Sequence, residues 1–186
     1  MRKILYIICW ALAGVGLYSC SLDEPSYGKT TSDNYYQKES DIEQALTGAY
    51  LQLRTTWNEY ALNHYFVGDC STDDALKGGG NDGDRAEVRD LSDFTVYTTN
   101  GEVGRRWEIL YRLINRCNDV IYYAPNAVGD KTLLKRYANE AKALRAFGYY
   151  CLVSTFGEVP LITTPMQPAE ILKYPVPHWR RYMNVL

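Results

Sequence analysis

One stretch of this 186-residue sequence, from Asn139 to Thr163, constrains the fold most strongly. Its apolar and small residues recur at every third or fourth position, which places them on one face of a helix. These residues are Ala141, Leu144, Gly148, Leu152 and Phe156. Gly157 can take the positive φ that closes a helix, and Pro160 cannot continue one. The pattern therefore predicts a buried helix over residues 131–156 and an extended segment after it.

Two earlier segments, near residues 41–63 and 102–124, show the same helical periodicity. The face of the first is made of Ile42, Ala45, Leu46, Ala49 and Leu53, and that of the second of Trp107, Leu110, Ile114, Cys117 and Ile121. Only a short connector separates the second helix from the third, so we expect these two to be antiparallel neighbours. The sequence predicts an all-α fold of tetratricopeptide-like stacked helical hairpins.

Capping signals place the ends of the first two helices. In a capping box, a hydroxyl residue and a Glu three positions later satisfy each other's backbone amides. Ser40 and Glu43 form the first such pair, and Thr99 and Glu102 form the second. Pro125 is expected to stop the second helix.

The region between the first two helices, residues 65–100, lacks helical periodicity. It contains the run Gly78–Asp84, which has four glycines and cannot hold a helix. We expect a long irregular loop here, with at most a short extended piece at Phe94–Tyr97. Long loops inside a compact domain tend to be functional or disordered, so this region is the best candidate for ligand recognition.

The first twenty residues have the form of a targeting segment. Arg2 and Lys3 give a positive start, and the 14 residues 4–17 carry no charge. At about 1.5 Å per residue this run is roughly 21 Å long, which is short for a hydrocarbon core of about 30 Å. The following string, LYSC at 17–20, resembles a bacterial lipobox, which makes Cys20 the expected lipidation site. The alternative is an ordinary secretory signal that happens to end near a Cys.

Three strings of the sequence resemble the SusD/RagB family of outer-membrane nutrient-binding lipoproteins. The longest is EAKALRAFGYYCLVSTFGEVPLI at 140–162, and the others are DIEQALTGAY at 41–50 and WEILYRLINRCNDVI at 107–121. The acidic residues just after Cys20 also resemble the export signal of surface lipoproteins in the Bacteroidetes. The resemblance implies a SusD-like protein that is lipid-anchored in the outer membrane and exposed at the cell surface.

The resemblance also divides the chain into segments. Residues 1–19 correspond to a lipoprotein signal peptide, 20–40 to a tether, and 41–175 to the N-terminal part of a SusD-like helical domain. Residues 176–186 form a divergent tail, since they are basic and aromatic where family members usually continue with an acidic, helix-starting stretch. The chain therefore looks like the truncated N-terminal portion of a longer protein.

Five residues are candidates for ligand binding. In the family, the loop after the first helix lends polar and aromatic residues to the ligand face, which implies Asp73, Asp74 and Arg85 here. Trp57 and Tyr97 are further candidates because exposed aromatic rings can stack on sugars. Other interpretations remain open: adjacent Asp residues are common turn formers. Tyr, with 17 copies in this chain, also serves half-buried packing.

The sequence gives no sign of a cofactor, a metal or nucleic acid. The two histidines, His64 and His178, are far apart and no Cys-x-x-Cys occurs, so no zinc site is predicted. A net charge of −2 offers no basic field for nucleic acid. Cys117 and Cys151 fall on apolar helix faces and are expected to be buried free thiols.

The function that the resemblance implies is capture of an oligosaccharide or similar nutrient and its delivery to a TonB-dependent, SusC-like outer-membrane transporter. No catalytic residue is assigned, so the chain is not expected to be an enzyme. The alternative is a tetratricopeptide-like scaffold that binds a protein or peptide on the outer membrane, which the helical pattern alone supports equally. A surface glycosidase, which would need two suitably spaced carboxylates, is a third hypothesis.

Overall fold

The computed structural model describes residues 35–54, 65–81 and 83–166, all within the unit Ser32–Leu186. Four α-helices occur in this part: α2 (Glu39–Tyr50), α3 (Ala86–Ser92), α4 (Gly101–Tyr123) and α5 (Lys131–Phe156). Shorter helical turns lie at Leu51–Leu53, Tyr65–Asp69 and Ala124–Asn126. The described residues form no strand, and their one β-type pairing is a single bridge between Lys38 and Val128. The predicted all-α class is confirmed.

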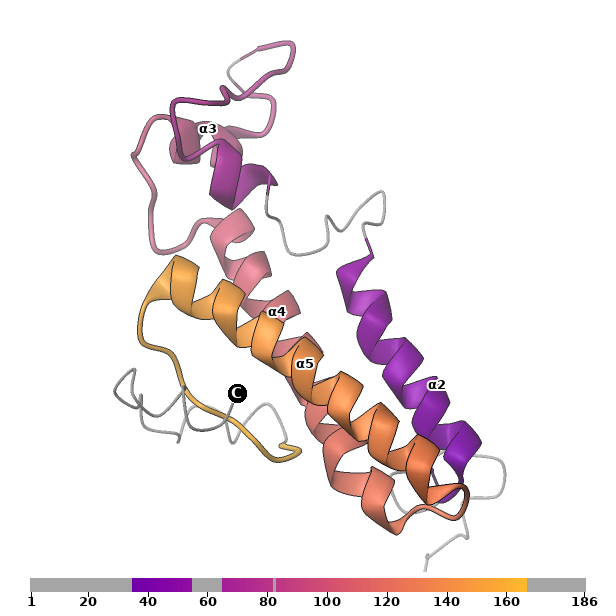
Figure 1. Cartoon of the computed structure of the whole chain (residues 1–186). Coiled ribbons are helices and arrows are strands. Elements are labelled where there is room, and N and C mark those ends of the chain that lie inside the picture. The colour runs from indigo at the N-terminus through magenta and orange to yellow at the C-terminus, as the bar shows by residue number, and fades with distance from the viewer. Residues whose placement is uncertain (1–34, 55–64, 82, 167–186) are drawn as a thin grey trace, which may run out of the picture. The chain divides into compact units, whose positions relative to one another are not determined.

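The two long helices, α4 and α5, lie side by side in opposite directions (Figure 1). Their connection is short, and Asp130 ends it by accepting a hydrogen bond from the Thr132 amide at 2.8 Å. Gly157, with a φ of 73°, closes α5. The predicted helix over residues 131–156 and its antiparallel neighbour are both confirmed.

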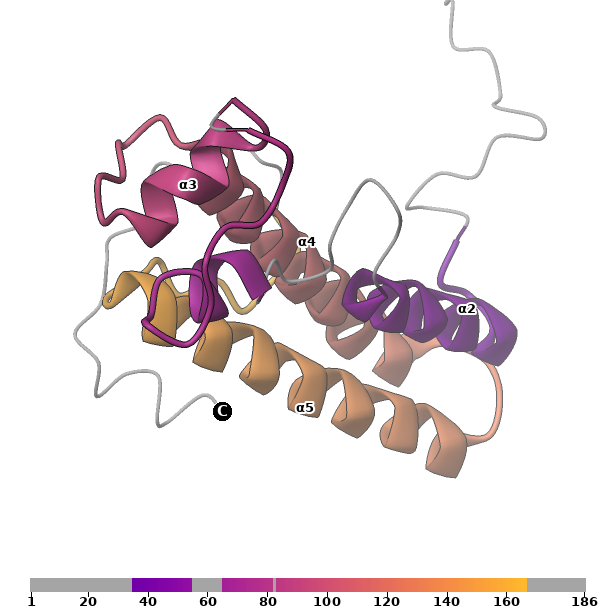
Figure 2. The same cartoon turned by 90° about the horizontal axis from the view of Figure 1, so that it is seen from above.

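Helix α2 packs against both long helices and completes the main core (Figures 1 and 2). All three helices contribute buried apolar residues: Ile42, Leu46 and Ala49; Leu113, Cys117 and Val120; Leu134, Tyr137, Ala141 and Leu144. Full burial of one large aliphatic side chain stabilises a fold by about 1.5–3 kcal/mol. The predicted helix faces therefore hold the structure together, although Ala45, Leu53, Trp107, Ile121 and Phe156 on those faces are only partly buried.

The segment after α5, residues 158–166, folds back along α4 and α5. Its side chains Val159 and Ile162 are buried against the two helices. The Tyr149 hydroxyl donates a hydrogen bond to the Ile162 carbonyl at 2.9 Å and accepts one from the Ile162 amide at 2.6 Å. The Tyr111 hydroxyl donates to the Pro160 carbonyl at 2.7 Å. Both tyrosines thus pack their rings in the core. Their hydroxyls bond backbone groups of the extended segment, which would otherwise need a neighbouring strand as partner.

A buried polar pair holds the same segment further along. Asn118 is completely buried, and its amide nitrogen donates to the carbonyls of Ile162 at 3.1 Å and Thr164 at 3.3 Å. Its oxygen accepts a hydrogen bond from Nη1 of Arg145 at 2.9 Å, and the same nitrogen donates to the Thr163 carbonyl at 3.2 Å. Burial lowers the pKa of Arg145. Because a buried polar group is stable only when it is bonded, these contacts fix where the segment lies.

The first helix begins earlier than its capping box predicted. Its N-cap is Lys38, whose amide donates to the Asp41 carboxylate at 3.0 Å, and the Glu39 amide bonds to the Val128 carbonyl at 2.9 Å. The predicted cap, Ser40, lies inside the helix. The Val128 carbonyl, in the segment before α5, bonds the first helical amide, and this tertiary contact allows α2 to begin before Ser40.

The cap of α4 is also displaced, by one residue. Asn100 rather than Thr99 accepts the hydrogen bonds of the first helical amides, from Glu102 at 3.1 Å and Val103 at 3.2 Å. Its side-chain amide donates to the Glu87 carbonyl at 2.9 Å. Asn is as good an N-cap as Thr or better, and here its second group also ties α4 to α3.

The predicted first helix, 41–63, is too long. α2 ends at Tyr50, the turn Leu51–Leu53 follows, and Arg54 is already extended with a ψ of 132°. Leu51 is 52% exposed, and Leu53 is the last residue of the predicted face that packs, in part, against the main core within the described residues 35–54. Residues 55–63 lie outside the described part of the chain.

The predicted irregular loop, 65–100, contains more helix than expected. It holds a π-helical turn at Tyr65–Asp69 and the helix α3. The extended piece expected at Phe94–Tyr97 is absent, because Phe94 has a φ of 56° and no residue there joins a strand. Val88 and Leu91 are buried at helical spacing, a signal too short to stand out in the sequence.

Candidate functional site

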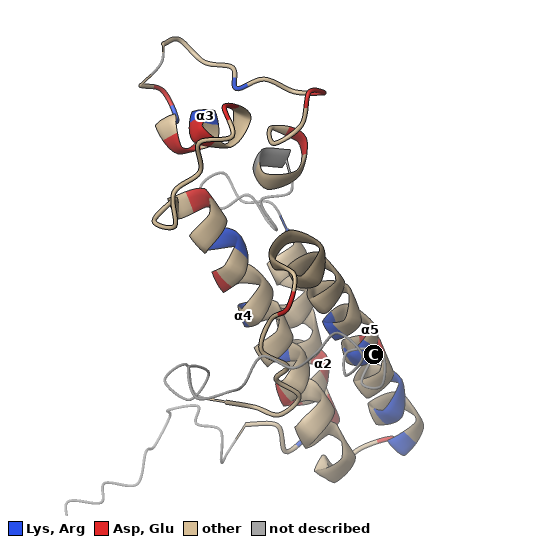
Figure 3. Cartoon of the chain, turned by 90° about the vertical axis from the view of Figure 1, so that its left-hand side faces the viewer, with Lys and Arg blue, Asp and Glu red and all other residues tan. Residues whose placement is uncertain are grey.

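The loop region, residues 70–100, is built on a core of three buried residues, Cys70, Val88 and Leu91. Glu87 joins it to α4, since its carboxylate accepts the Gly101 amide at 2.9 Å. This small core supports a mostly polar surface. Figure 3 shows Asp, Glu, Lys and Arg residues of both signs on the loop and α3, so no single-sign field covers this region.

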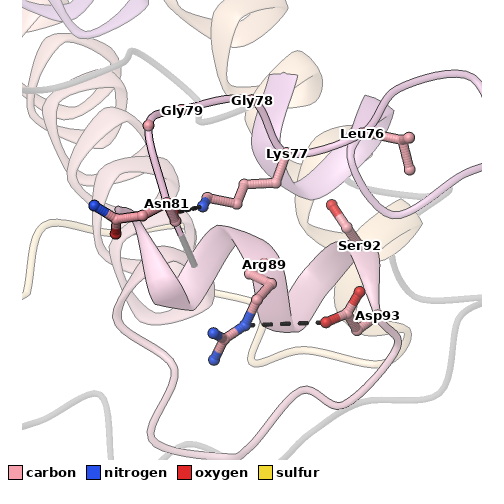
Figure 4. A pocket seen from close by; sticks show the side chains of 9 residues that line it. Leu76, Lys77, Gly78, Gly79, Asn81, Arg89, Ser92 and Asp93 are labelled. Carbon is pink, nitrogen blue, oxygen red and sulfur yellow. Dashed lines mark hydrogen bonds and ion pairs between the residues drawn. The ribbon is translucent and has the colours of Figure 1, made fainter. Parts of the chain in front are cut away.

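A shallow pocket, here called the glycine-loop pocket, opens between the glycine run and α3 (Figure 4). Its volume is about 370 Å³, and it is lined by Leu76, Lys77, Gly78, Gly79, Gly80, Asn81, Arg89, Ser92 and Asp93. The Lys77 ammonium donates to the Asn81 carbonyl at 2.6 Å. Arg89 lies 3.6 Å from Asp90 and 4.0 Å from Asp93. Cationic donors and carboxylate acceptors therefore surround one small space.

The shape of this pocket depends on local turn chemistry. The Asn81 side chain accepts hydrogen bonds from the amides of Gly83 at 2.9 Å and Asp84 at 3.1 Å, which is an Asx turn. The Asp84 carboxylate in turn accepts the Gly80 amide at 3.3 Å. Gly79 has a φ of 114°, and a Cβ there would overlap the Asp84 carboxylate. Only glycine fits this position without strain.

Two aromatic side chains extend from the chain just after α3. Phe94 directly follows the pocket residue Asp93 and is 73% exposed, and Tyr97 is 67% exposed. Exposed rings can stack on sugars, and sugar recognition combines ring faces with donors and acceptors such as those of Lys77 and Arg89. The chemistry available here is binding by hydrogen bonds and stacking.

The structure does not place the sequence-predicted candidates in the lining of the glycine-loop pocket. Asp73 and Asp74 are exposed in a turn, where the Asp74 amide donates to the Thr72 hydroxyl at 3.3 Å. Arg85 is in the left-handed region, with a φ of 47°, and pairs with the mostly buried Glu102 at 3.3 Å. None of the three lines the glycine-loop pocket.

The remaining candidates divide into one described and two undescribed residues. Tyr97 is exposed, as expected. Trp57 and Cys20 lie outside the described residues. As ligand-binding and lipidation sites, all of these residues remain predictions.

Sequence reasoning missed the pocket residues Lys77, Asn81, Arg89 and Ser92. The glycine run next to Asn81 was visible as a turn signal. The string AEVRDLS at 86–92, with apolar residues three apart and a polar opposite face, was the signal for α3.

No group of His, Cys, Asp and Glu among the described residues could hold a metal ion, and none of the helices that the structure describes is long and apolar enough to cross a membrane. Cys70, Cys117 and Cys151 are buried free thiols, as expected for the last two. Burial raises the pKa of the Cys117 thiol to about 12.

Comparison with known proteins gives a consistent result. No family model matches the chain. SusD-like protein P2 of Formosa agariphila is 28% identical over 174 residues, which cover 91% of this chain and 33% of that protein. SusD-like protein P25 of the same organism is 24% identical over 181 residues, with 91% and 33% coverage. This chain thus spans about a third of the length of these relatives.

Two solved structures share the fold. A laminarin binding SusD-like protein superposes with a TM-score of 0.63 and 31% identity, over 73% of this chain and 29% of the other. Surface glycan-binding protein A from Bacteroides fluxus superposes with a TM-score of 0.61 and 28% identity, over 80% and 32%. The similarity therefore extends from sequence to helix arrangement.

Proposed function

We propose that this chain, a SusD-like homologue that corresponds to about a third of its relatives' length, belongs to a cell-surface protein that binds glycans. Its function is capture and not cleavage. The structural relatives support this, because one is named a laminarin binding SusD-like protein and the other a surface glycan-binding protein.

The observation that carries the proposal is the glycine-loop pocket with its neighbouring rings. A volume of about 370 Å³ lies within the usual range of small-ligand sites, roughly 300–1,000 Å³. Lys77 and Arg89 present donors and Asp93 presents acceptors, and the exposed rings of Phe94 and Tyr97 follow Asp93 in the chain. A neutral polysaccharide such as a β-glucan is bound by such a mixture of donors, acceptors and rings, and its binding site requires no net charge.

Binding is tested with laminarin in affinity gels and by calorimetry, with product release followed as reducing ends. We expect retardation without any reducing ends. Lys77→Ala and Arg89→Ala should each weaken binding about tenfold, as expected for loss of a charged hydrogen bond. Arg136→Ala on α5, which removes an exposed cation paired with Glu140, is the matched control and should bind normally. Unchanged binding in both pocket variants would reject the pocket as the site.

Anchoring and delivery form the second part of the proposal. Cys20 carries the lipid, and two or three acyl chains would hold the protein firmly to the outer membrane. Labelled palmitate should enter the wild type and not Cys20→Ser. A TonB-dependent transporter is the proposed recipient of the glycan, so a large outer-membrane barrel should co-purify with the lipidated protein. Co-purification of a peptide partner without any glycan binding would favour the scaffold alternative instead.

A further inference from the structure

An apolar groove, here called the α4–α5 groove, lies between the end of α4 and the first half of α5. Its floor is formed by Ile121, Ala124, Leu134 and Ala138, and its volume is about 270 Å³. Ala124 and Leu134 are almost completely buried, so the floor is recessed below the surface. The described lining contains no aromatic ring. Such a groove suits a protruding aliphatic side chain better than a sugar, which is usually bound against ring faces.

The charge of this groove comes from lysines alone. Lys131, Lys135 and Lys142 line it, and none of its described lining residues is acidic. Nζ of Lys131 donates to the carbonyls of Pro125 at 3.2 Å and Ala127 at 2.7 Å, so this lysine ties the connection between the helices. Lys135 and Lys142 are exposed, and neither forms an ion pair with a described residue. Two ammonium groups are therefore available to an incoming partner.

The acidic side chains nearest to the groove along the chain are bonded elsewhere. Asp119 on α4 accepts a hydrogen bond from the Tyr36 hydroxyl at 3.3 Å. Glu140 on α5 pairs with Arg136 at 3.3 Å, and Asp130 caps the start of α5. None of the three carboxylates lines the groove, so its local charge is positive.

The groove continues the path of the segment that follows α5. Asn118 and Arg145 bind carbonyls of that segment, and the groove begins about one helical turn beyond them, at Ile121 and Lys142. No described residue of the segment, which is described as far as Met166, lines the groove. An extended chain is thus already held between α4 and α5 by its carbonyls and its aliphatic side chains. The same two helices offer a second extended chain an apolar floor and two cations.

We infer that the α4–α5 groove is a docking site for an extended acidic peptide segment of a partner protein. An aliphatic side chain of the peptide fills the floor, and its carboxylates pair with Lys135 and Lys142. These lysines are seven residues apart, which is about 10.5 Å along a helix. Carboxylates two to four residues apart in an extended chain, about 7–13 Å, reach both. The inference is independent of the proposed glycan binding.

Two other occupants fit the groove less well. Residues 167–186 of this chain carry one acidic side chain, Glu170, against three Lys or Arg, so their charge does not match a lysine-lined groove. A lipid surface with anionic headgroups would use the lysines but not the recessed apolar floor. An acidic peptide with aliphatic residues uses both.

The test measures binding of three labelled peptides to the full chain by fluorescence anisotropy, at low and at physiological salt. The first peptide has Leu and Ile flanked by Asp and Glu, the second has Asn and Gln in place of the acids, and the third has Ser in place of Leu and Ile. At low salt we expect the first to bind at least about fivefold tighter than either of the others, with its advantage over the second shrinking as salt rises. Equal binding of the first and third peptides would mean that charge alone is recognised and would overturn the inference.

Two double variants locate the binding site. Lys135→Gln combined with Lys142→Gln should reduce the preference for the first peptide over the second to within about twofold. Arg112→Gln combined with Arg136→Gln removes two exposed cations outside the groove, changes the net charge equally and should leave the preference intact. All four positions are exposed, so we expect unchanged circular dichroism. A preference that survives the lysine variant, or that falls equally in both variants, would contradict docking in this groove.

Further probes identify the occupant. A peptide of residues 167–186 that binds as tightly as the first peptide would overturn the inference in favour of this chain's own residues. Phosphatidylglycerol vesicles that bind through Lys135 and Lys142, without binding of the first peptide, would overturn it in favour of a lipid surface. Laminarin binding, measured in parallel, should be the same in the lysine variant and the wild type, so failure of this inference and failure of the proposed function are distinguishable.

Discussion

The paired helices α4 and α5 and the loop region 70–100 are neighbours in one chain but are stabilised in different ways. Helices α4 and α5 bury long apolar faces, and Asn118 and Arg145 lie bonded between the two helices and the segment after α5. The loop region buries little more than Cys70, Val88 and Leu91 and depends on turns and caps. A region with few buried contacts opens at lower free energy, and binding loops usually come from such regions. We therefore interpret α4 and α5 as a scaffold and propose the loop region as the recognition surface.

The largest effect is expected from the buried polar pair. Asn118→Leu removes one acceptor of Arg145 and the donor of two carbonyls. It should lower the free energy of unfolding by about 3 kcal/mol, because a buried guanidinium and two carbonyls each lose a hydrogen bond. Urea denaturation measures this. Asn115→Leu, which removes a single half-exposed bond to the Met166 amide at 3.3 Å, is the control and should cost about 1 kcal/mol or less. Equal losses would mean that the pair does not organise the segment.

A smaller effect is expected from overpacking the helix interface. Ala141 on α5 is completely buried in the core that α5 shares with α2 and α4. Ala141→Leu should destabilise the fold by about 1–3 kcal/mol. Lys142→Ala, on the exposed side of the same helix, should change stability by less than about 0.5 kcal/mol. If urea denaturation showed the same small loss of stability for both variants, the inference of close helix packing at Ala141 would be wrong.

In the loop region the expected effect is local. Gly79→Ala should strain the glycine loop by about 1 kcal/mol and break the bond between Asp84 and the Gly80 amide. We expect about fivefold weaker laminarin binding with nearly unchanged global stability. Gly104→Ala on α4 is the control, since Gly104 does not line the pocket and a Cβ there meets open space. Lost global stability in Gly79→Ala would contradict the independence of the two regions.

The smallest effect concerns pH. The pKa of Cys117 is about 12 in the folded chain because of burial, against an ordinary value near 9. As pH rises through 9 the unfolded thiol ionises first, so stability that is complete below this pH is progressively lost, by about 0.5 kcal/mol at pH 9. Under reducing conditions, Cys117→Ala should show a flatter pH dependence of unfolding between pH 8 and 9.5 than the wild type. Identical slopes would argue against this burial.

The contrast between the long helices and the loop region also explains which elements could be predicted from the sequence. α5 was predictable to its last residue because two local signals agree. The spacing of Ala141, Leu144 and Gly148 indicates a helix, and Gly157 indicates where it ends. α3 was not, because Val88 and Leu91 are one apolar pair whose partner, Cys70, is distant in sequence. Tertiary contacts also moved both caps, and no local pattern contains them.

For the candidate site, the glycine run indicated a recognition loop but not its residues. The resemblance to the family implied Asp73, Asp74 and Arg85 as polar residues of this loop. The glycine-loop pocket is instead formed where the glycine run lies against α3. Likewise, Arg106 on α4 is only 2% exposed and donates to the Thr155 hydroxyl near the end of α5 at 2.8 Å, a contact between residues 49 positions apart. Neither arrangement is encoded in a short window of sequence.

The most direct test of this account is hydrogen–deuterium exchange of the full chain with and without laminarin oligosaccharide. The account predicts fast exchange in residues 70–100 of the free protein, slow exchange in α4 and α5, and ligand-induced protection at residues 76–97. Protection confined to the helices, or a loop region that exchanges as slowly as α5 and does not respond to ligand, would contradict the division into scaffold and recognition surface.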